Sequence, residues 1–399
     1  MSEAARGTPH PDPEAYRAGV RDWLARNLPP AWRADEPGYR APFLPELTDF
    51  EHRLHAAGYA GMAWPRAYGG QDLTIREHLI VNQEIGRLAM PLSVNSLGKE
   101  LVGPILLAVG SEAQRLRFIP KLLAMEETWC QGFSEPEAGS DLARVRTTAR
   151  RVEGGWRIDG QKIWTSLADR ADHCLLLART GAADDRHGSL GLFALPMRSP
   201  GITVRPIRQM TEAEGFCEVF FDGVMLPDDA LIGSENAGWR SAVEVLAVER
   251  ATNRMYRGWR FENEFRHLVG VCAAEPALRP ALADAGIRGR LAATWADIEV
   301  VKRYAIDVVD RLAAGGRIGQ HGSFMKLHWS EAHQRFAVLA LDVLGRAWAA
   351  SSPGLEAARR RFEEIYLQGR AETIFAGTTE IQLGIIADRI LGLPRGEKR

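Results

Sequence analysis

The spacing of apolar residues changes twice along this 399-residue chain, and these changes constrain its fold more than any other feature. Residues 1–127 and 236–399 carry apolar side chains at helical spacing, as in PEAYRAGVRDWLARNL near the N-terminus. Residues 128–235 instead hold short apolar runs, such as HCLLLART and CEVFFDGVML, bounded by Gly, Pro and Asp. The pattern predicts an α+β protein with a helical domain, a small β-barrel or sandwich domain, and a second helical domain.

Composition excludes several classes of function. The formal net charge is −1, which gives no basic surface for nucleic acid. The four cysteines are scattered without metal-ligand or disulfide spacing, so we expect reduced core thiols and no metal site. The first residues do not resemble a signal peptide, and no stretch reaches the roughly 18 apolar residues of a membrane span. We therefore expect a cytoplasmic protein.

Two segments of the β region carry residues suited to binding a ligand. WCQGFSEPEAGSDLA, residues 129–143, gathers small and hydroxyl residues that let backbone N–H groups approach a planar polar molecule. In DGQKIWTSLAD, residues 159–169, a Trp is followed by two hydroxyl residues, which could stack on a ring and bond its edge. From composition alone, an ordinary surface loop and a core Trp remain the alternatives.

In this order along the chain, the two segments resemble the acyl-CoA dehydrogenase family. The resemblance continues through AWPRAYGGQDLT, ENAGWRSAVEVLAVER and IFAGTTEIQLGIIADRILGLPR, and it covers about residues 13–395. It implies an acyl-CoA dehydrogenase-like fold with a C-terminal four-helix bundle, and FAD as the cofactor. It also implies oxidation of an acyl-CoA thioester to the trans-2-enoyl-CoA. A carboxylate removes the α-proton, and the electrons pass to an electron-transfer flavoprotein.

The same resemblance implies which residues bind the flavin. Phe133 and Ser134 match the loop at the pyrimidine edge of the flavin, and Trp164 matches a residue packed along its ring. Ser166 matches the hydroxyl that reaches the N5 region. Ser140 matches a hydroxyl near the substrate and the phosphates of the cofactor. The cofactor-binding positions are completed by Gly139, Thr378 and Glu380.

The catalytic base of the family is absent from its usual position. Many members read Ile-Tyr-Glu-Gly-Thr there, whereas this chain has Ala376 in place of the Glu. The Ala376 backbone N–H is retained and can still bind the thioester oxygen. Relatives similar to isovaleryl-CoA and long-chain acyl-CoA dehydrogenases take the base from an earlier helix, directly before an Arg. That alignment predicts Glu249 as the base, followed by Arg250 as a further catalytic position.

The local sequence supports Glu249 as a base rather than as a surface residue. The preceding residues 245–248 are Val, Leu, Ala and Val, so the carboxylate would be partly desolvated and more basic. A direct ion pair with Arg250 is not the natural alternative, because adjacent helix residues do not face each other. Glu135 and Glu380 rank lower, because they match family positions that do not serve as the base.

The chain departs from the family where a neighbouring subunit would contact FAD. CAAEPALRPALADAG contains no Arg-x-x-Phe-Gly motif. In LDVLGRAW, Asp342 replaces a Gln and Arg346 replaces the second of two glycines. Both departures affect the adenine and pyrophosphate end of FAD. We therefore expect a homodimer, a homotetramer, or a heteromer with a homologous subunit.

Three functions remain in competition. The first is an active dehydrogenase whose substrate is branched or bulky, because Ala376 leaves more space beside the acyl carbons than Glu would. The second is a catalytically silent or half-site subunit of a heteromeric dehydrogenase. The third is a flavin oxidase or monooxygenase on the same fold, which would react with oxygen and release peroxide.

Overall fold

A computed structural model gives the fold of the chain. It describes residues 7–29, 45–88, 93–181, 185, 187–249, 255–316, 319 and 322–394, without the side chains of residues 244–249. The chain divides into two compact units. The first comprises Met1–Thr8, Pro42–Leu73 and Ser93–Glu249, and the second comprises Pro9–Ala41, Thr74–Leu92 and Arg250–Arg399. The N-terminal helical region therefore contributes to both units. No helix in the described part of the chain is long and apolar enough to cross a membrane.

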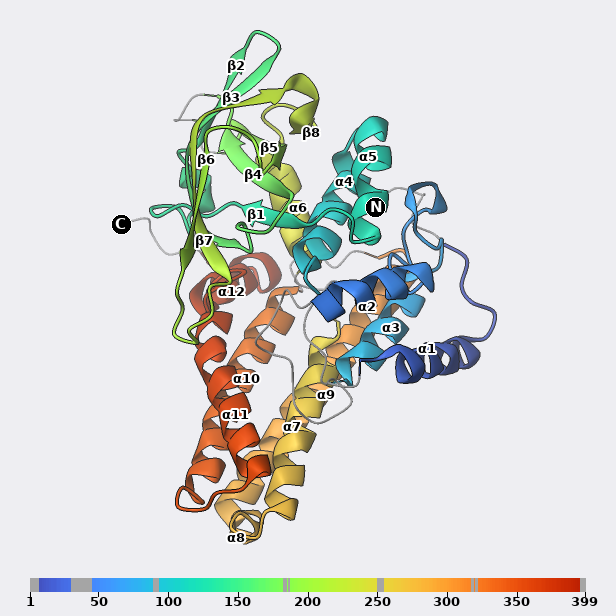
Figure 1. Cartoon of the computed structure of the whole chain (residues 1–399), viewed down its shortest axis with the longest axis vertical. Coiled ribbons are helices and arrows are strands. Elements are labelled where there is room, and N and C mark those ends of the chain that lie inside the picture. The colour runs from blue at the N-terminus through green and yellow to red at the C-terminus, as the bar shows by residue number, and fades with distance from the viewer. Residues whose placement is uncertain are drawn as a thin grey trace. The chain divides into compact units, whose positions relative to one another are not determined.

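The first unit contains a single sheet and several short helices (Figure 1). The sheet order is β6-β7-β3-β2-β4-β5-β8, and β1 pairs in parallel with β4. The strands are β1 (Trp129–Gly132), β2 (Thr148–Val152), β3 (Gly155–Ser166), β4 (His173–Arg179), β5 (Leu190–Pro196), β6 (Ile202–Ile207), β7 (Phe216–Pro227) and β8 (Leu231–Ile232). The helices are α2 (Pro45–Ala56), α4 (Gly103–Val109), α5 (Glu112–Leu123) and α6 (Gly238–Glu249), with a π-helical turn at Gly98–Val102.

Strand β4 lies at the centre of the first unit, and all of its residues are buried. Successive side chains of a strand point to opposite faces, so β4 contributes to two cores. Leu175 and Leu177 pack in a cluster with apolar residues of α4 and α5. Leu176 instead packs with Trp156 of β3 and Val219 of β7. A strand buried on both faces explains the continuous apolar run CLLLA, which has no polar alternation.

The sequence TARRVEGGWRIDG places two short strand-like runs around a Gly-Gly pair, a pattern typical of a hairpin, and the structure has the hairpin of β2 and β3 there. The two strands pair antiparallel, with Val152 opposite Gly155. Gly154 adopts a φ of +77°, which a glycine reaches without steric cost. The tight turn brings β3 back beside β2 and extends it to Ser166, the last residue of the second candidate ligand-binding segment.

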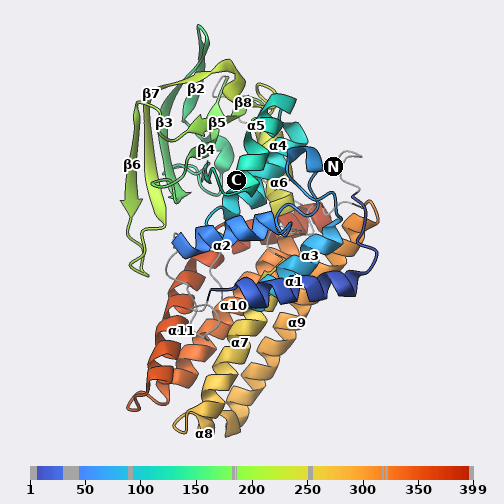
Figure 2. The ribbon, with the colours of Figure 1, turned by 45° about the vertical axis from the view of Figure 1, so that its right-hand side comes forward.

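The second unit is helical. Its four long helices α7, α9, α10 and α11 run side by side (Figures 1 and 2) and enclose one apolar core. The helices are α1 (Pro13–Asn27), α3 (Ile75–Gly86), α7 (Arg257–Ala274), α8 (Arg279–Ala283), α9 (Ala285–Ala313), α10 (Gly322–Gly345), α11 (Pro353–Glu372) and α12 (Thr379–Ile385), followed by a π-helical turn at Ile386–Ile390. Their starts follow the sequence: Asp284 caps α9, and Ser352 caps α11.

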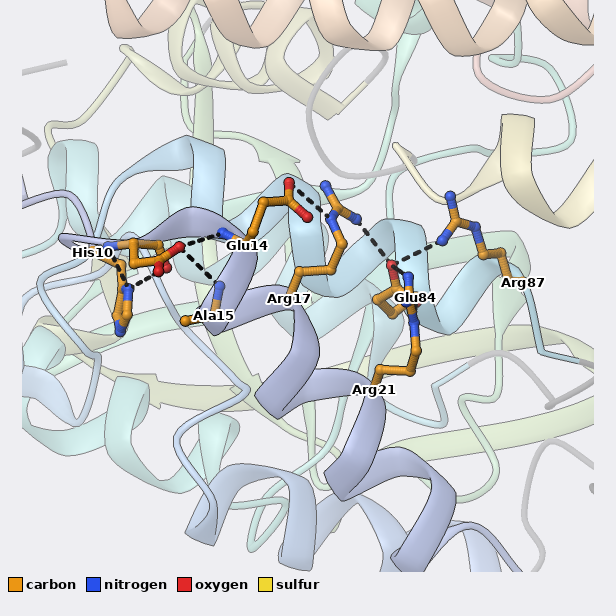
Figure 3. A network of polar contacts seen from close by, with 8 residues as sticks. His10, Glu14, Ala15, Arg17, Arg21, Glu84 and Arg87 are labelled. Carbon is orange, nitrogen blue, oxygen red and sulfur yellow. Dashed lines mark hydrogen bonds and ion pairs between the residues drawn. The ribbon is translucent and has the colours of Figure 1, made fainter.

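A buried carboxylate joins α1 to α3 within this unit. Glu84 of α3 accepts hydrogen bonds from Arg17 at 2.9 Å and from Arg21 at 3.0 Å, and it also binds Arg87 (Figure 3). Burial alone would raise the pKa of Glu84, but the guanidinium groups outweigh it and lower the pKa. The network attaches the N-terminal helix to the bundle.

Candidate functional site

The loop after β1 lies beside the end of β3 in the first unit. The backbone N–H of Ile163 donates to the carbonyl of Ser134 at 2.9 Å. Phe133 is buried, whereas Ser134 and Ser166 are half-buried. The two segments that the sequence suggests for ligand binding are therefore in direct contact, even though they are separate in the chain.

The side chain of Trp164, near the end of β3, is exposed to solvent. Its side chain is 56% exposed, and its φ is +59°, a backbone conformation that bulky residues rarely adopt. The register between β3 and β7 shifts between Lys162 and Thr165, so Trp164 lies in a bulge. The Thr165 hydroxyl is buried and has no hydrogen-bond partner among the described residues. An exposed aromatic face beside hydroxyl groups suits a planar ligand with a polar edge.

A buried ion pair between Lys162 and Glu135 holds the loop after β1 in place. Lys162 is fully buried, and its Nζ donates to Glu135 Oε1 at 2.8 Å and to the Phe133 carbonyl at 3.0 Å. Glu135, which is 7% exposed, also accepts from the backbone N–H groups of Arg146 at 2.6 Å and Thr147 at 2.9 Å. The carboxylate is thus fully engaged in holding the loop, which agrees with its low rank as a candidate base.

The pKa values of Glu135 and Lys162 are shifted by burial and by the charge of the partner. Burial alone would raise the pKa of Glu135, but the Lys162 ammonium and the hydrogen bonds to the carboxylate lower it below its ordinary value. Burial lowers the pKa of Lys162, and Glu135 partly opposes that change. Sequence analysis did not single out Lys162, because a lysine in a polar stretch has no local signature of burial.

The remaining loop residues lie at the surface. Gly139 and Ser140 are exposed, and no atom lies within 4 Å of the position that a Cβ on Gly139 would take. An open pocket follows along the chain, and its lining includes Arg144, Arg146 and Arg179. Arg179 is buried and fixed by the carbonyls of Ala143 and Val145, whereas Arg144 is exposed. Asp141 also lines this pocket, and Arg146 pairs with Glu137 at 2.8 Å, so the pocket carries charges of both signs.

In the second unit, the residues predicted near the substrate lie in the turn between α11 and α12. Ala376 is half-buried and has a φ of +53°. Its backbone N–H has no hydrogen-bond acceptor among the described residues. The buried Gln382 donates from Nε2 to the carbonyl of Ala376 at 2.9 Å and to that of Gly377 at 3.3 Å. The turn is therefore held by its carbonyl groups, while the Ala376 N–H is left as a donor.

Thr378 and Glu380 begin α12. The Thr378 hydroxyl caps the helix by accepting the Ile381 N–H at 3.3 Å. Glu380 is exposed, and its own backbone N–H and the Thr378 hydroxyl lower its pKa. Both residues have a role in forming the helix, and their predicted contact with a cofactor remains a prediction.

The predicted base lies at the limit of what the structure describes. Glu249 is the last residue of α6, but its side chain is outside the described residues, as is Arg250 entirely. The assignment of the base thus remains a prediction from the sequence.

The two positions that depart from the subunit-contact motif have partners within the second unit. Asp342 pairs with Arg290 of α9, and Arg346 binds Asp284 at 3.0 Å. Both pairs are partly exposed, so they contribute little to stability. These charges therefore serve within the helical unit, in place of the Gln and Gly of the family.

Comparison with known proteins identifies the family. Models of the N-terminal, middle and C-terminal domains of acyl-CoA dehydrogenases match residues 10–126, 130–224 and 236–391. The acyl-CoA dehydrogenase IpdE1 of Mycobacterium tuberculosis is 38% identical over 397 residues, which cover 97% of this chain and 99% of that protein. IpdE1 of Mycolicibacterium smegmatis is 37% identical over 403 residues, with 96% and 99% covered.

Solved structures of similar proteins agree with this family assignment. The Tcur3481-Tcur3483 steroid ACAD is 26% identical, with a TM-score of 0.84, and the match covers 96% of this chain and 98% of that chain. The ChsE4-ChsE5 complex from Mycobacterium tuberculosis is also 26% identical, with a TM-score of 0.80 and coverage of 98% and 99%. Since three consecutive domain models and relatives of nearly full length all match, the chain belongs to the acyl-CoA dehydrogenase family.

Proposed function

We propose that this chain is the FAD-binding, catalytically active subunit of an acyl-CoA dehydrogenase, and that its substrate is branched or bulky near the thioester. One combination of observations carries the proposal. The β unit keeps an exposed Trp164 beside the half-buried hydroxyl of Ser166. The helical unit keeps a free backbone donor at Ala376, although the side chain there has lost its carboxylate.

The residues of the β unit suit a flavin. Trp164 offers an aromatic face. Ser166 of the same strand and Ser134 of the loop that contacts it offer polar groups. In the pocket that follows this loop along the chain, the exposed Arg144 offers a guanidinium group to a phosphate, although Asp141 lines the same pocket. When bound, FAD supplies the acceptor for the hydride that leaves the β-carbon.

The protein groups would manage the proton and the developing negative charge. Glu249 removes the α-proton as the general base. The Ala376 N–H donates to the thioester oxygen, where negative charge grows as the proton leaves. Arg250 adds a positive charge directly after the base. In this proposal the base, Glu249, belongs to α6, and the oxyanion donor, the Ala376 N–H, belongs to the turn between α11 and α12.

The substrate is proposed from the size of residue 376 and from the relatives. An alanine there leaves space that a glutamate would fill. One relative of known structure is a steroid ACAD, which points to an acyl chain attached to a ring system. Initial rates on isobutyryl-, isovaleryl-, octanoyl- and steroid-side-chain CoA esters test this. We expect the bulky and branched esters to give the higher kcat/KM, and a preference for octanoyl-CoA would contradict it.

The assembly and the electron acceptor are proposed in the same way. Asp342 and Arg346 pair with Arg290 and Asp284 and replace residues that contact a neighbour's FAD in the family. The ChsE4-ChsE5 relative is a complex of two different chains. We propose a heteromer with a homologous subunit that completes the adenine end of the FAD site, and an electron-transfer flavoprotein as the acceptor.

Anaerobic titration of the purified protein with acyl-CoA tests the proposed function. An active subunit holds FAD, alone or together with its partner subunit, and its flavin absorbance bleaches on addition of substrate. A protein whose bound FAD does not bleach with any of the acyl-CoA esters would indicate a catalytically silent subunit. Peroxide release in air during steady turnover would indicate an oxidase.

Replacing Trp164 with Ala is expected to weaken FAD binding without unfolding the protein. Stacking on an aromatic side chain contributes about 1–3 kcal/mol per ring, so we expect a 5- to 150-fold higher Kd for FAD. The side chain is mostly exposed, so the apoprotein should keep its melting temperature. Fluorescence titration of apoprotein with FAD measures the first effect, and thermal unfolding monitored by circular dichroism measures the second. Trp348, which is 81% exposed, provides the matched Trp→Ala control.

A further inference from the structure

A histidine lies between two carboxylates inside the helical unit. His333 of α10 binds Glu264 of α7 through Nε2 at 2.8 Å and Glu372 of α11 through Nδ1 at 2.7 Å. All three side chains are buried. Because ionised carboxylates only accept hydrogen bonds, both ring nitrogens donate and the imidazole is positively charged. The contacts are therefore charge-assisted, and they join three helices at one point.

The pKa values agree with this arrangement. Burial alone would lower the pKa of His333, but Glu372 and Glu264 outweigh it and raise the pKa to about 10. Burial would raise the pKa of Glu264, but His333 outweighs it and lowers that pKa to about 2. The imidazolium is thus charged throughout the physiological pH range.

The same stretch of α10 binds the last turn of α11 a second time. Gln334 donates from Nε2 to the Gly369 carbonyl at 2.7 Å and to the Thr373 hydroxyl at 3.0 Å. Glu372 is the last residue of α11, and Thr373 follows it as the cap. Two consecutive residues of α10 therefore fix the point at which the helix ends.

The chain then makes the turn that carries Ala376. The N–H groups of Ile374 and Phe375 both donate to the Ala371 carbonyl at 2.9 Å, and Thr379 N–H donates to the Thr373 carbonyl at 3.0 Å. Ala376 itself holds a positive φ that a residue with a Cβ adopts only when its surroundings impose it. The fixed end of α11 is therefore one of the constraints on the direction of the Ala376 N–H.

We propose that His333, acting through Glu372, and Gln334 are positioning residues that keep the Ala376 N–H aligned with the thioester oxygen of the substrate. The proposal rests on the proposed function, because it assigns that N–H to the thioester. An oxyanion donor stabilises developing charge only if its position is fixed in advance. A misplacement of about 1 Å can reduce the rate about 100-fold. Glu264 binds the same imidazole on the side away from the turn and carries no such role.

The matched variants are Glu372→Ala and Glu264→Ala, because each removes one buried carboxylate from His333. We expect Glu372→Ala to lower kcat by about 10- to 100-fold with a smaller change in KM. The exchange of the substrate α-proton with deuterium in D2O should slow by the same factor. Glu264→Ala should lower the melting temperature to a similar extent but change kcat less than about 3-fold. Glu372→Gln retains an acceptor for the imidazole and should recover most of the rate.

A second readout needs neither FAD nor substrate. Amide hydrogen exchange of residues 373–378 in the ligand-free protein should accelerate in Glu372→Ala and in Gln334→Ala, and stay unchanged in Glu264→Ala. Gln334 is half-buried, so its variant should fold even if the carboxylate variants do not. Equal effects of Glu372→Ala and Glu264→Ala on rate and on exchange would overturn the proposal. A wild-type protein that acyl-CoA does not bleach would instead refute the proposed function and leave the exchange result standing.

Discussion

Replacing Glu249 with Gln is expected to slow the anaerobic bleaching of the flavin by acyl-CoA by about 10²- to 10⁴-fold, the usual contribution of a positioned general base. The amide keeps the size of the carboxyl group but cannot take the α-proton. FAD content and the Kd for a CoA thioester should stay near the wild-type values, because the change affects the proton transfer and not the binding groups. Stopped-flow absorbance of the flavin measures the rate.

The helix that carries Glu249 also offers a matched control. Glu244 lies five residues earlier in α6, and at about 100° per residue the two positions are about 140° apart around the helix axis. Glu244→Gln removes an identical group from the same helix and should bleach at the wild-type rate. Loss of rate in both variants would indicate damage to the helix, and bleaching of Glu249→Gln at the wild-type rate would move the base elsewhere.

Returning a carboxylate to the family's usual position tests the same idea from the other side. In the Glu249→Gln background, Ala376→Glu should restore part of the rate, because this residue stands where many family members carry the base. Ala376 already places a Cβ at a φ of +53°, so the glutamate adds no new backbone cost there. The restored activity should favour straight acyl chains, since the larger side chain fills the space proposed for bulky substrates.

Local sequence patterns predicted the individual elements well. The start of α1 at Pro13 could be predicted, because helical apolar spacing begins there and proline is tolerated at the first position of a helix. The Gly-Gly pair at 154 and 155 predicted the hairpin of β2 and β3. Each of these features depends on neighbours within a few residues, so the sequence states them directly.

The long-range contacts were not predictable in the same way. His333 is separated from Glu264 by 69 residues and from Glu372 by 39, and each of the three is unremarkable in its own helix. Lys162 and Glu135 are 27 residues apart, and a charged residue in a polar stretch normally indicates solvent. The distribution of α1 and α3 to one unit and of α2 to the other also depends on tertiary packing. The candidate site was therefore found through its motif, while its supporting contacts required the structure.

Replacing Lys162 with Met is expected to destabilise the protein by about 3–5 kcal/mol, the usual cost of leaving one member of a buried ion pair without its partner. Methionine has a similar length and fits the buried space, so the loss comes mainly from the uncompensated charge of Glu135. The carbonyl of Phe133 also loses its donor. Urea unfolding followed by circular dichroism measures the effect, and FAD affinity should fall with it, since Phe133 and Ser134 belong to the supported loop.

The double variant Glu135→Gln/Lys162→Met separates charge from packing. A neutral amide at position 135 leaves no buried charge, and its one oxygen can still accept from the backbone N–H of either Arg146 or Thr147. We expect the double variant to be more stable than Lys162→Met alone, although it carries one substitution more. A double variant as unstable as the single one would show that the ammonium serves through its bond to the Phe133 carbonyl.

The pH dependence of the stability of Lys162→Met also separates the effect of charge from that of packing. In the wild type, the pKa of Glu135 lies below its ordinary value of 4.5, so its contribution to stability is present above that pH and lost as the pH falls. Without Lys162 the largest of the influences that lower the pKa of Glu135 is lost, so burial moves that pKa upward from its wild-type position. The variant's deficit should therefore shrink as the pH falls from neutral toward the range in which the buried carboxyl takes up a proton. A deficit that is independent of pH would place its origin in packing, because only an unpaired carboxylate becomes less costly as it is protonated.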